Sequence, residues 1–584
     1  MYTNFENILK RNGTQPNIVL ILADDLGWNG VGFHGSRQVK TPNIDKLAEE
    51  GLVLNNYYAQ PVCSPSRAAL MTAFQFPLHC ENTNFCFSIF KFGEIVISWF
   101  AMIRNRQRVG IPLDIKLLPE HLNDLGYESH AVGKWHLGVF AEEYLPTFRG
   151  FNTFYGLYNG KGDHFSHWDT ENGMYGLDWH LDIGRYNRTN VVDEMGNYST
   201  RAFSKRAAKL ISEHDFESKP LFLYLPITAP HSAEKYDPVQ VPRDAEELAT
   251  GTYHVQRRKY LGVVSEMDQF VGRVRDSLES KGVLDNTIII FSSDNGGTPN
   301  GQYDNWASNF PLRSAKGFLY EGGVRVAGLI WGDVIKNRSG QVSTEMMHIS
   351  DWYPTLYSFA GGDAADLEDI DSFDMTGVLT GSNTTSPRTE FVINFDPAEC
   401  SKGMRVGWYK YLLNPNDFNE VIMDDWYQAP GKCPGSNETM LPNTTPSQIT
   451  CEPVPRTRKV DLRCYSEKSG LNECLYDVEN DPCEYYNLID DEDYLSIKEN
   501  ILERIEFWEK KQVQPLMPPS DVSANTKFFN YTWVPWTTNT TIDTRLENYT
   551  PHSCNCTFPP TNTESLNVET YDTYGNKSQE QLSY

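Results

Sequence analysis

Three apolar runs of strand length, each followed closely by polar side chains, constrain the fold of this chain more than any other feature. Residues 17–23 read Asn-Ile-Val-Leu-Ile-Leu-Ala, and similar runs span 221–226 and 287–291. A continuous apolar run of this length is typical of a strand that is buried on both faces, as in parallel sheets covered by helices. We therefore predict an α/β fold with a central, mostly parallel sheet.

Helical and strand-like patterns alternate with these runs. Residues 43–50 read as a capped helix closed by Gly51, and apolar residues recur at helical spacing over 260–278. Such a stripe is typical of a helix packed against a core. Residues 52–58 and 127–132 have the composition of further strands. The alternation agrees with an α/β domain.

The length of 584 residues allows a large core and more than one domain. A polar stretch at 363–386 is typical of a linker. Beyond it, 409–413 and 474–482 resemble strands of a small antiparallel sheet, and 494–511 resembles an amphipathic helix. After about Pro518 the Thr/Asn-rich sequence predicts a poorly ordered tail. The predicted segments are an N-terminal segment 1–15, a large domain 16–362 with an atypical insert 74–107, a linker 363–386, a C-terminal subdomain 387–517 and a glycosylated tail 518–584.

Composition excludes one class of function and favours one compartment. The formal net charge of −26 leaves no basic surface for the phosphates of a nucleic acid. Twelve Asn-x-Ser/Thr sequons favour a glycoprotein of the secretory pathway, lysosomal or extracellular. Of eleven cysteines, six lie between Cys400 and Cys483 without zinc-ligand spacing, which predicts a disulfide framework. Residues 1–15 are polar and show no apolar core of a signal peptide.

A short polar motif, Cys63-Ser-Pro-Ser-Arg67, follows the predicted strand 52–58 and opens a helix-like stretch. Pro65 suits a first helical turn, so Cys63 is expected where free backbone N–H groups favour an anion. A buried or disulfide-bonded cysteine is the alternative for a chain with this many sequons. The motif alone leaves both interpretations open.

Oxygen-bearing side chains follow two of the apolar runs. Asp24 and Asp25 come directly after residues 17–23, and Asp294 and Asn295 come after the run 287–291. Ligand sites in open α/β sheets lie at the carboxyl ends of strands, and an oxygen-only set selects Ca²⁺ or Mg²⁺ over zinc. An Asx turn or a helix N-cap is the alternative for an isolated Asp-Asp pair.

Further motifs connect these residues. Residues 133–138 read Gly-Lys-Trp-His-Leu-Gly, Asp294 begins Asp-Asn-Gly-Gly, and 311–317 read Pro-Leu-Arg-Ser-Ala-Lys-Gly. Together with the Cys63 motif, this set resembles the sulfatase family, and several segments resemble its arylsulfatase B-type members most closely. The resemblance implies an alkaline-phosphatase-like α/β fold with a smaller C-terminal domain. It also implies hydrolysis of sulfate monoesters, such as aryl sulfates or sulfated carbohydrates of the N-acetylgalactosamine 4-sulfate type.

The resemblance implies two cofactor features. A formylglycine-generating enzyme would oxidise Cys63 to Cα-formylglycine, whose hydrated aldehyde serves as the nucleophile. One Ca²⁺ would bind sulfate oxygens and draw charge from the transition state. Its expected ligands are Asp24, Asp25, Cys63, Asp294 and Asn295.

The resemblance also implies a role for each remaining motif residue. Arg67 would hold the formylglycine hydroxyl and the carboxylates near the metal in place. Lys134 and Lys316 would bind sulfate oxygens. His231, in the context Ala-Pro-His-Ser-Ala, would assist the leaving alcohol, and His136 would take a proton during sulfate release.

One segment departs from the family pattern. Family members usually continue after the Thr72 position with Gly-Arg, where this chain has Ala-Phe, and residues 74–107 show no family resemblance. Residues 85–103 are largely apolar but carry Lys91 and Glu94, so a membrane span is the weaker interpretation and none is expected. We predict a sequence artefact or a poorly packed surface excursion beside the active site.

Two other functions stay open on the sequence. A phosphomonoesterase or phosphodiesterase of the same superfamily normally carries Ser or Thr as its nucleophile and His/Asp zinc ligands, unlike Cys63 and its oxygen-only neighbours. A sulfatase-like secreted glycoprotein that lost activity through its insert is the other alternative.

Overall fold

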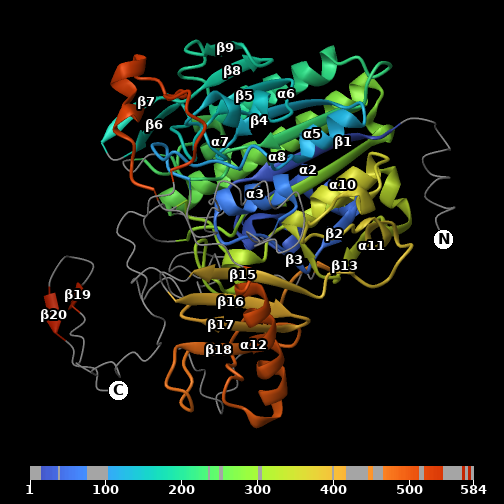
Figure 1. Cartoon of the computed structure of the whole chain (residues 1–584), viewed down its shortest axis with the longest axis vertical. Helices are drawn as coiled ribbons and strands as arrows, with labels where there is room; N and C mark the ends of the chain where they lie inside the picture. Colours follow the sequence, from blue (N-terminus) through green and yellow to red (C-terminus); the bar gives the residue numbers. More distant parts are fainter. Residues whose placement is uncertain are drawn as a thin grey trace.

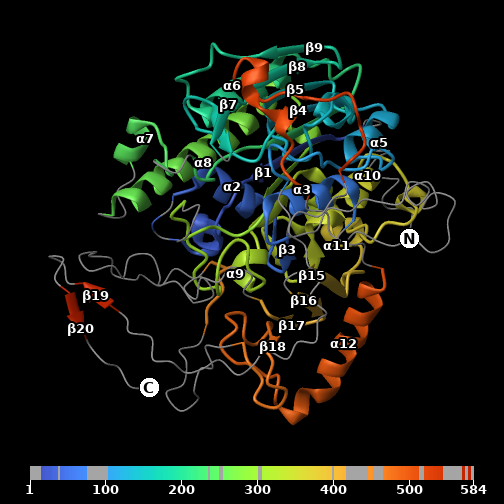
Figure 2. The same ribbon diagram turned by 60° about the vertical axis from the view of Figure 1, so that its left-hand side comes forward.

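The computed structural model describes residues 15–36, 38, 40–74, 103–171, 173–233, 237–248, 254–299, 305–396, 400–415, 445–451, 464–511 and 518–543, with the backbone of 569–571 and 577–579. Figure 1 shows a large α/β domain, with a smaller sheet and its helix below it. Figure 2 shows the same two parts from a second side, with the long helix α12 (Leu495–Glu509) beside the small sheet. The predicted fold class is confirmed.

A mixed sheet of ten strands forms the centre of the described large domain. Its middle strands β11, β1, β10, β4 and β5 run parallel, and antiparallel strands lie on both sides of them. The spatial order is β13 (Gln341–Ser343), β2 (Leu52–Leu54), β12 (Gly328–Trp331), β11 (Thr287–Ser293), β1 (Asn17–Ala23), β10 (Leu221–Pro226), β4 (Glu128–Lys134), β5 (Thr153–Leu157), β8 (His180–Ile183) and β9 (Asn187–Asn190).

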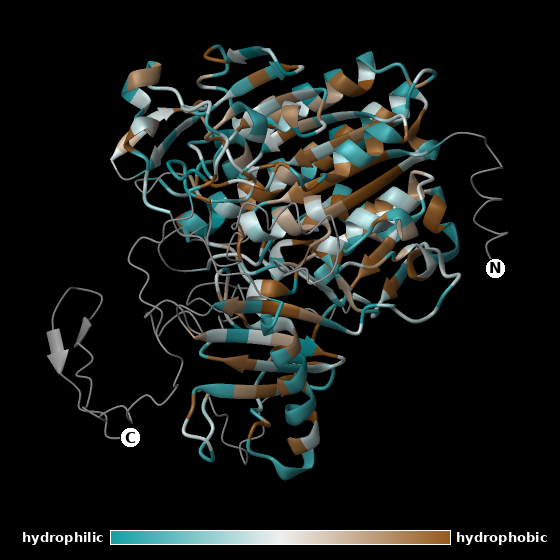
Figure 3. Ribbon diagram, in the orientation of Figure 1, coloured by the Kyte–Doolittle hydropathy of each residue, from teal (hydrophilic) through white to brown (hydrophobic). Residues whose placement is uncertain are grey.

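Helices cover both faces of this sheet, so its central strands are apolar on both sides. Val19 and Ile21 of β1 pack with the helices α2, α6 and α8, whereas Leu20 and Leu22 pack with α3, α5 and α10. Figure 3 shows the resulting apolar band through the middle of the domain. The helices are α2 (Pro42–Glu50), α3 (Cys63–Thr72), α5 (Leu118–Asp124), α6 (Ser199–Glu213), α8 (Val255–Lys281) and α10 (Trp352–Phe359).

Two predicted strands differ from the observed ones. The single strand predicted over 52–58 is wrong, because β2 ends at Leu54 and β3 (Tyr57–Tyr58) pairs with β14 (Met347–His348) in a separate small sheet. The strand predicted over 127–132 continues as β4 to Lys134, so this lysine lies within the strand. The strand-like composition therefore located both elements but missed a break in one and the end of the other.

The C-terminal part of the chain forms a four-stranded antiparallel sheet with α12 packed against it. Disulfides join Cys451 to Cys483 and Cys464 to Cys474, which confirms bridging within the predicted cysteine-rich stretch. The strands are β15 (Glu390–Asp396), β16 (Ser401–Val406), β17 (Tyr409–Leu413) and β18 (Glu473–Asp477).

Residues 363–386, expected as a linker, carry a packed helix. Helix α11 (Thr376–Thr380) places Leu379 in the core, fully buried beside α10. The remaining short elements of the described chain include the strands β6 (Trp168–Glu171), β7 (Met174–Leu177), β19 (Glu569–Tyr571) and β20 (Lys577–Gln579) and the helices α7 (Arg243–Leu248) and α9 (Glu321–Val324).

Two segments that were expected to pack poorly are in fact held against the large domain. Trp533 is 2% exposed, and its backbone N–H donates to the carbonyl of Leu177 at 2.9 Å. Asn105 Nδ2 donates to Asp169 Oδ2 at 2.5 Å, and the two segments also contact each other, since the N–H of Asp521 donates to the carbonyl of Arg106 at 2.7 Å. The poor order expected for 518–543 and the poor packing expected for 103–107 are therefore wrong. Residues 75–102 lie outside the described residues, and the alternative of a sequence artefact stays a prediction. None of the described helices is long and apolar enough to cross a bilayer.

Candidate active site

The predicted site residues gather at the carboxyl end of the parallel strands. Asp24 and Asp25 follow β1, Lys134 is the last residue of β4, and Asp294 follows β11. β1 pairs in parallel with both β10 and β11, and β10 pairs in parallel with β4, so these strand ends share one edge of the sheet. This edge is where open α/β sheets bind ligands.

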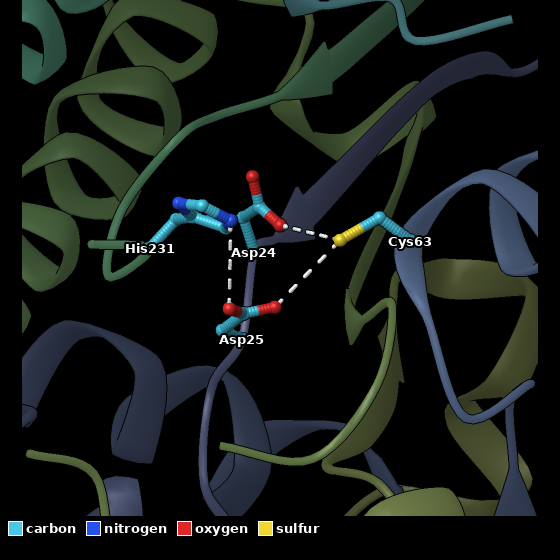
Figure 4. A group of neighbouring side chains, drawn as sticks. All are labelled: Asp24, Asp25, Cys63 and His231. Atoms are coloured by element: carbon cyan, nitrogen blue, oxygen red, sulfur yellow. Dashed lines mark hydrogen bonds and ion pairs between the residues drawn. The ribbon is translucent and has the colours of Figure 1, made fainter. Parts of the chain in front are cut away.

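Cys63 is the first residue of α3 and is a buried free thiol, so the disulfide-bonded alternative is wrong. Figure 4 shows the Cys63 side chain facing the carboxylates of Asp24 and Asp25. Its Sγ lies 3.4 Å from Asp24 Oδ1 and 3.7 Å from Asp25 Oδ1. Burial, with the negative charge of Asp294, raises the pKa of the thiol well above its usual value. A protonated thiol is a poor nucleophile, so the side chain as encoded is not activated for attack.

The positive charges of three side chains balance the negative charges of the three carboxylates around Cys63. Lys316 Nζ lies 2.6 Å from Asp25 Oδ1 and 3.1 Å from Cys63 Sγ. Lys134 Nζ lies 2.8 Å from Asp24 Oδ2. Buried charges are stable only when paired in this way. Burial alone would raise the pKa of Asp24, but Lys134 and the neighbouring cations hold it well below its usual value.

Arg67 anchors the third carboxylate. Its Nη2 and Nε donate to Asp294 Oδ2 at 2.8 and 3.1 Å, and its Nη1 donates to the carbonyl of Lys134 at 3.1 Å. The other oxygen, Oδ1 of Asp294, accepts from the backbone N–H of Asp25 at 3.2 Å. Burial and the charge of Asp24 still raise the pKa of Asp294 to about 6. Arg67 therefore ties α3 to the ends of β4 and β11.

The donor set fits a hard divalent cation. Asp25 Oδ2 and Asn295 Oδ1 are buried and accept no hydrogen bond from any described residue. The side chains of Asp24, Asp25, Cys63 and His231 each offer a ligand atom, and these atoms lie within 4.8 Å of one another. Asn295 Nδ2 lies 2.7 Å from Asp25 Oδ1, which places its amide in the same group. Carboxylate and amide oxygens are the ligands that Ca²⁺ and Mg²⁺ prefer.

His231 faces this group with an unprotonated nitrogen. Its Nδ1 donates to the carbonyl of Ser232 at 2.6 Å, so Nε2 of the neutral ring keeps a lone pair. That Nε2 lies 3.6 Å from Asp25 Oδ2. Burial lowers the pKa of His231 to about 4, although Asp25 and Asp24 oppose the shift.

His136 lies beside the cluster and makes no hydrogen bond to it. Its Nε2 lies 3.0 Å from the carbonyl of Ile103, and its buried Nδ1 has no partner among the described residues. Burial and the charge of Lys134 lower the pKa of its imidazole well below the usual value. The backbone of His136 has φ = 60°, in the left-handed region, and that of Asp25 has φ = 63°. Such strain is typical of functional sites.

Three supporting residues carried no sequence signal. Asn305 Nδ2 donates to the carbonyls of Asp25 and Pro230 at 2.9 and 3.0 Å and is fully buried. His164 Nε2 lies 3.0 Å from the carbonyl of His231. The backbone N–H of Ile103 donates to Ser64 Oγ at 3.2 Å, so the end of the predicted insert contacts the first turn of α3. All three act through backbone groups, which a residue pattern does not reveal.

Comparison with known proteins identifies the family. Residues 16–362 match the family model described as Sulfatase. The chain belongs to the sulfatase family. Arylsulfatase J of Mus musculus is 34% identical over 532 residues, covering 90% of this chain and 80% of the relative. N-acetylgalactosamine-6-sulfatase of Canis lupus familiaris is 30% identical over 450 residues, covering 75% and 79%. The crystal structure of Ps i-CgsB has a TM-score of 0.64 at 24% identity and covers 88% of this chain and 97% of that chain.

Membership of the sulfatases confirms the predicted family and makes the chain a sulfuric ester hydrolase. It also confirms the alkaline-phosphatase-like fold. Sulfatases in general use a formylglycine and a divalent metal, and the residues around Cys63 fit both. The closer resemblance to arylsulfatase B-type sulfatases stays a prediction, because the relatives named above are other members of the family.

Proposed function

We propose that this sulfatase hydrolyses sulfate monoesters of N-acetylgalactosamine-containing glycans, with Cα-formylglycine at position 63 and one Ca²⁺. The observation that carries the proposal is the position of Cys63 Sγ, 3.1 Å from Lys316 Nζ and 3.4 Å from Asp24 Oδ1. The residue at 63 thus lies between the cationic and the carboxylate side chains, where a sulfate group and a metal ion would meet.

Asp24, Asp25, Asp294 and Asn295, with the residue at 63, would hold the Ca²⁺. The ion would supply Lewis-acid stabilisation of the charge on sulfate oxygens. Formylglycine would supply a hydrated aldehyde with two hydroxyl groups, one for attack on sulfur and one for release of the sulfate, a route that the Cys63 thiol lacks.

The chain's own side chains perform the remaining steps. Lys134 and Lys316 bind and orient the sulfate oxygens, and Arg67 keeps the Asp294 carboxylate in place through its two hydrogen bonds. His231 assists the leaving alcohol through Nε2, which faces the site and carries a proton only in the cationic form of the ring. His136 accepts a proton at Nδ1 during sulfate release, because the Ile103 carbonyl fixes the proton on its Nε2.

The same proposal includes the cellular context. A formylglycine-generating enzyme would act on the Cys63 motif in the secretory pathway, and the sequons and disulfides agree with a lysosomal or extracellular destination. The proposed units are the catalytic domain 16–362, the connecting segment 363–386, the C-terminal subdomain 387–517 and the glycosylated segment 518–584.

The test combines modification, metal and substrate. Secreted protein should yield a peptide with formylglycine at position 63 by mass spectrometry and about one Ca²⁺ per chain by elemental analysis. It should release sulfate from N-acetylgalactosamine 4-sulfate faster than from the 6-sulfate. A faster 6-sulfate reaction would assign the specificity named for the Canis lupus familiaris relative. Unmodified Cys63 in an active preparation would overturn the proposed nucleophile.

A further inference from the structure

A second cluster of candidate metal ligands lies at the opposite end of the central sheet from the active site. Glu128 begins β4, His130 lies two residues further on, and His214 directly follows α6. Each side chain offers one ligand atom, and the three atoms lie within 4.8 Å of one another. At a rise of about 3.3 Å per residue, β4 separates Glu128 from Lys134 by about 20 Å. The cluster is therefore distinct from the residues around Cys63.

One ring nitrogen of each histidine already has a polar partner, which leaves the other nitrogen for a metal ion. His214 Nε2 lies 2.9 Å from the carbonyl of Lys219, which can only accept, so Nδ1 of the neutral ring keeps its lone pair. His130 Nδ1 lies 2.8 Å from Thr153 Oγ1, and its Nε2 lies 3.4 Å from Glu128 Oε1. Metal-binding histidines are held in the same way, with the second ring nitrogen bonded to a carbonyl or another polar group.

The electrostatic surroundings keep the imidazole of His130 in the form that binds metals. Burial, followed by the charges of His214 and Arg206, lowers the pKa of His130 to about 4. A plain ion pair with Glu128 would require a protonated ring, which this environment disfavours. The Glu128 side chain is 35% exposed, so an ion can enter from solvent. The positive charge of Arg206 opposes a bound cation.

We propose that Glu128, His130 and His214 bind one Zn²⁺ in a site separate from catalysis. Two imidazoles and one carboxylate are an established zinc ligand set and leave a fourth position for water. Imidazole nitrogens distinguish this site from the oxygen-rich set that suits Ca²⁺. The ion joins β4 to the connection between α6 and β10. Glu128 pairs with Leu221 in the sheet, so the first residues of β4 and β10 are neighbours. Bound zinc would hold these two strand ends together and stabilise the folded chain.

The experiment uses the full secreted chain, stripped by a chelator and dialysed against Zn²⁺ with an excess of Ca²⁺. We expect one bound zinc per chain by elemental analysis and a zinc-dependent rise in the melting temperature. Substitution with Co²⁺ should give the visible bands of a tetrahedral site without a thiolate-to-cobalt charge-transfer band. A charge-transfer band would place the ion at unmodified Cys63 instead and overturn the proposal. Loss of the bound zinc in Asp25→Asn would do the same for chains in which position 63 is already formylglycine.

Variants locate the ion. His214→Gln and His130→Gln should lose the zinc and its effect on melting, and Thr153→Val should weaken zinc binding about 10- to 100-fold. Glu128→Gln is nearly isosteric at a partly exposed position, so it tests the site even where a histidine variant fails to fold. His121→Gln, a histidine on α5 outside the cluster, is the matched control and should keep the zinc. Full zinc retention by Glu128→Gln and His214→Gln, or no zinc in the parent chain, would overturn the site.

Discussion

Among the buried charge clusters of the described residues, two differ in how far their polar atoms are satisfied. One surrounds Cys63 at the carboxyl edge of the sheet. The other joins the large domain to the C-terminal sheet, and we call it the interface cluster. Its members, all fully buried or nearly so, are Tyr58, Glu321, Arg405, Lys410 and Glu484.

In the interface cluster the carboxylate oxygens lie close to donors, although Glu484 Oε1 is held only by its ion pair and Arg405 Nη2 has no hydrogen-bond partner among the described residues. Lys410 Nζ lies 3.0 Å from Glu321 Oε1 and 2.9 Å from Glu484 Oε1. The hydroxyl of Tyr58 donates to Glu321 Oε2 at 2.7 Å, and the N–H of Glu321 donates to Glu484 Oε2 at 2.8 Å. Arg405 contacts the Tyr58 hydroxyl. Such a network fixes one arrangement of the two domains.

The catalytic cluster leaves acceptors open. Asp25 Oδ2 and Asn295 Oδ1 have no hydrogen-bond partner among the described residues, and the backbones of Asp25 and His136 are left-handed. Unpaired buried acceptors cost free energy unless a ligand completes them. In the interface cluster Glu484 Oε1 still has the Lys410 cation at 2.9 Å, and the open Arg405 Nη2 is a donor that cannot bind a cation. The difference teaches that buried charge alone does not mark a cation site, whereas buried acceptors without a cation or a hydrogen bond do.

The largest expected effect is on catalysis and concerns only the cluster around Cys63. Cys63→Ser should lower turnover on an aryl sulfate on the order of 10⁶-fold, as removal of other enzyme nucleophiles does. Serine cannot be converted by a cysteine-specific oxidation and has no second hydroxyl for sulfate release. The melting temperature should change little, because serine keeps the shape of the side chain. Sustained multiple turnover by this variant would contradict the proposed chemistry.

The second prediction concerns how much the interface cluster contributes to the free energy of unfolding. Lys410→Met should lower the free energy of unfolding by about 3–5 kcal/mol, because it leaves two buried carboxylates without their shared cation. Lys402→Met is the matched control on the same sheet. Its partner Glu509 lies at 2.7 Å, but both side chains are partly exposed, so the cost should stay below about 1 kcal/mol. Chemical denaturation measures both variants. If they lose equal free energy of unfolding, the buried Lys410 contributes no more than a partly exposed ion pair.

The pKa values of the two carboxyl groups in the interface cluster are shifted in opposite directions. Burial, only partly offset by Lys410, raises the pKa of Glu484 to about 7. Burial also acts on Glu321, but Lys410 and Arg325 outweigh it and lower its pKa to about 2. Glu321 therefore ionises first, and Glu484 keeps its proton in the folded protein up to about pH 7.

The third prediction concerns the pH dependence of stability. Between pH 4.5 and pH 7 the unfolded chain releases the Glu484 proton while the folded chain retains it, so stability falls as pH rises. The loss from this group is at most about 3 kcal/mol. Glu484→Gln mimics the neutral form and should flatten this part of the stability profile, measured by denaturation across the pH range. A slope that the variant leaves unchanged would assign the pH dependence to other groups.

The sequence predicted one cluster and not the other for a physical reason. Asp24 and Asp294 each follow an apolar run, so strand geometry alone places them at one edge. Glu321, Lys410 and Glu484 lie far apart in the chain and meet only when two domains pack, which no local pattern encodes. Residues 518–543 show the same limit, since a Thr/Asn-rich composition predicted disorder where backbone hydrogen bonds and Trp533 provide packing.

The smallest expected effect tests whether only the catalytic cluster responds to a cation. Free Ca²⁺ at ten times its Kd should raise the free energy of unfolding by about 1.4 kcal/mol. Binding stays modest because Arg67, Lys134 and Lys316 repel the ion even as the open oxygens of Asp25 and Asn295 attract it. Asp25→Asn should therefore require more Ca²⁺ for the same stabilisation, whereas Glu484→Gln should respond like the parent chain. An unchanged response in Asp25→Asn would mean that Ca²⁺ binds elsewhere, and the contrast between the two clusters would then rest on catalysis alone.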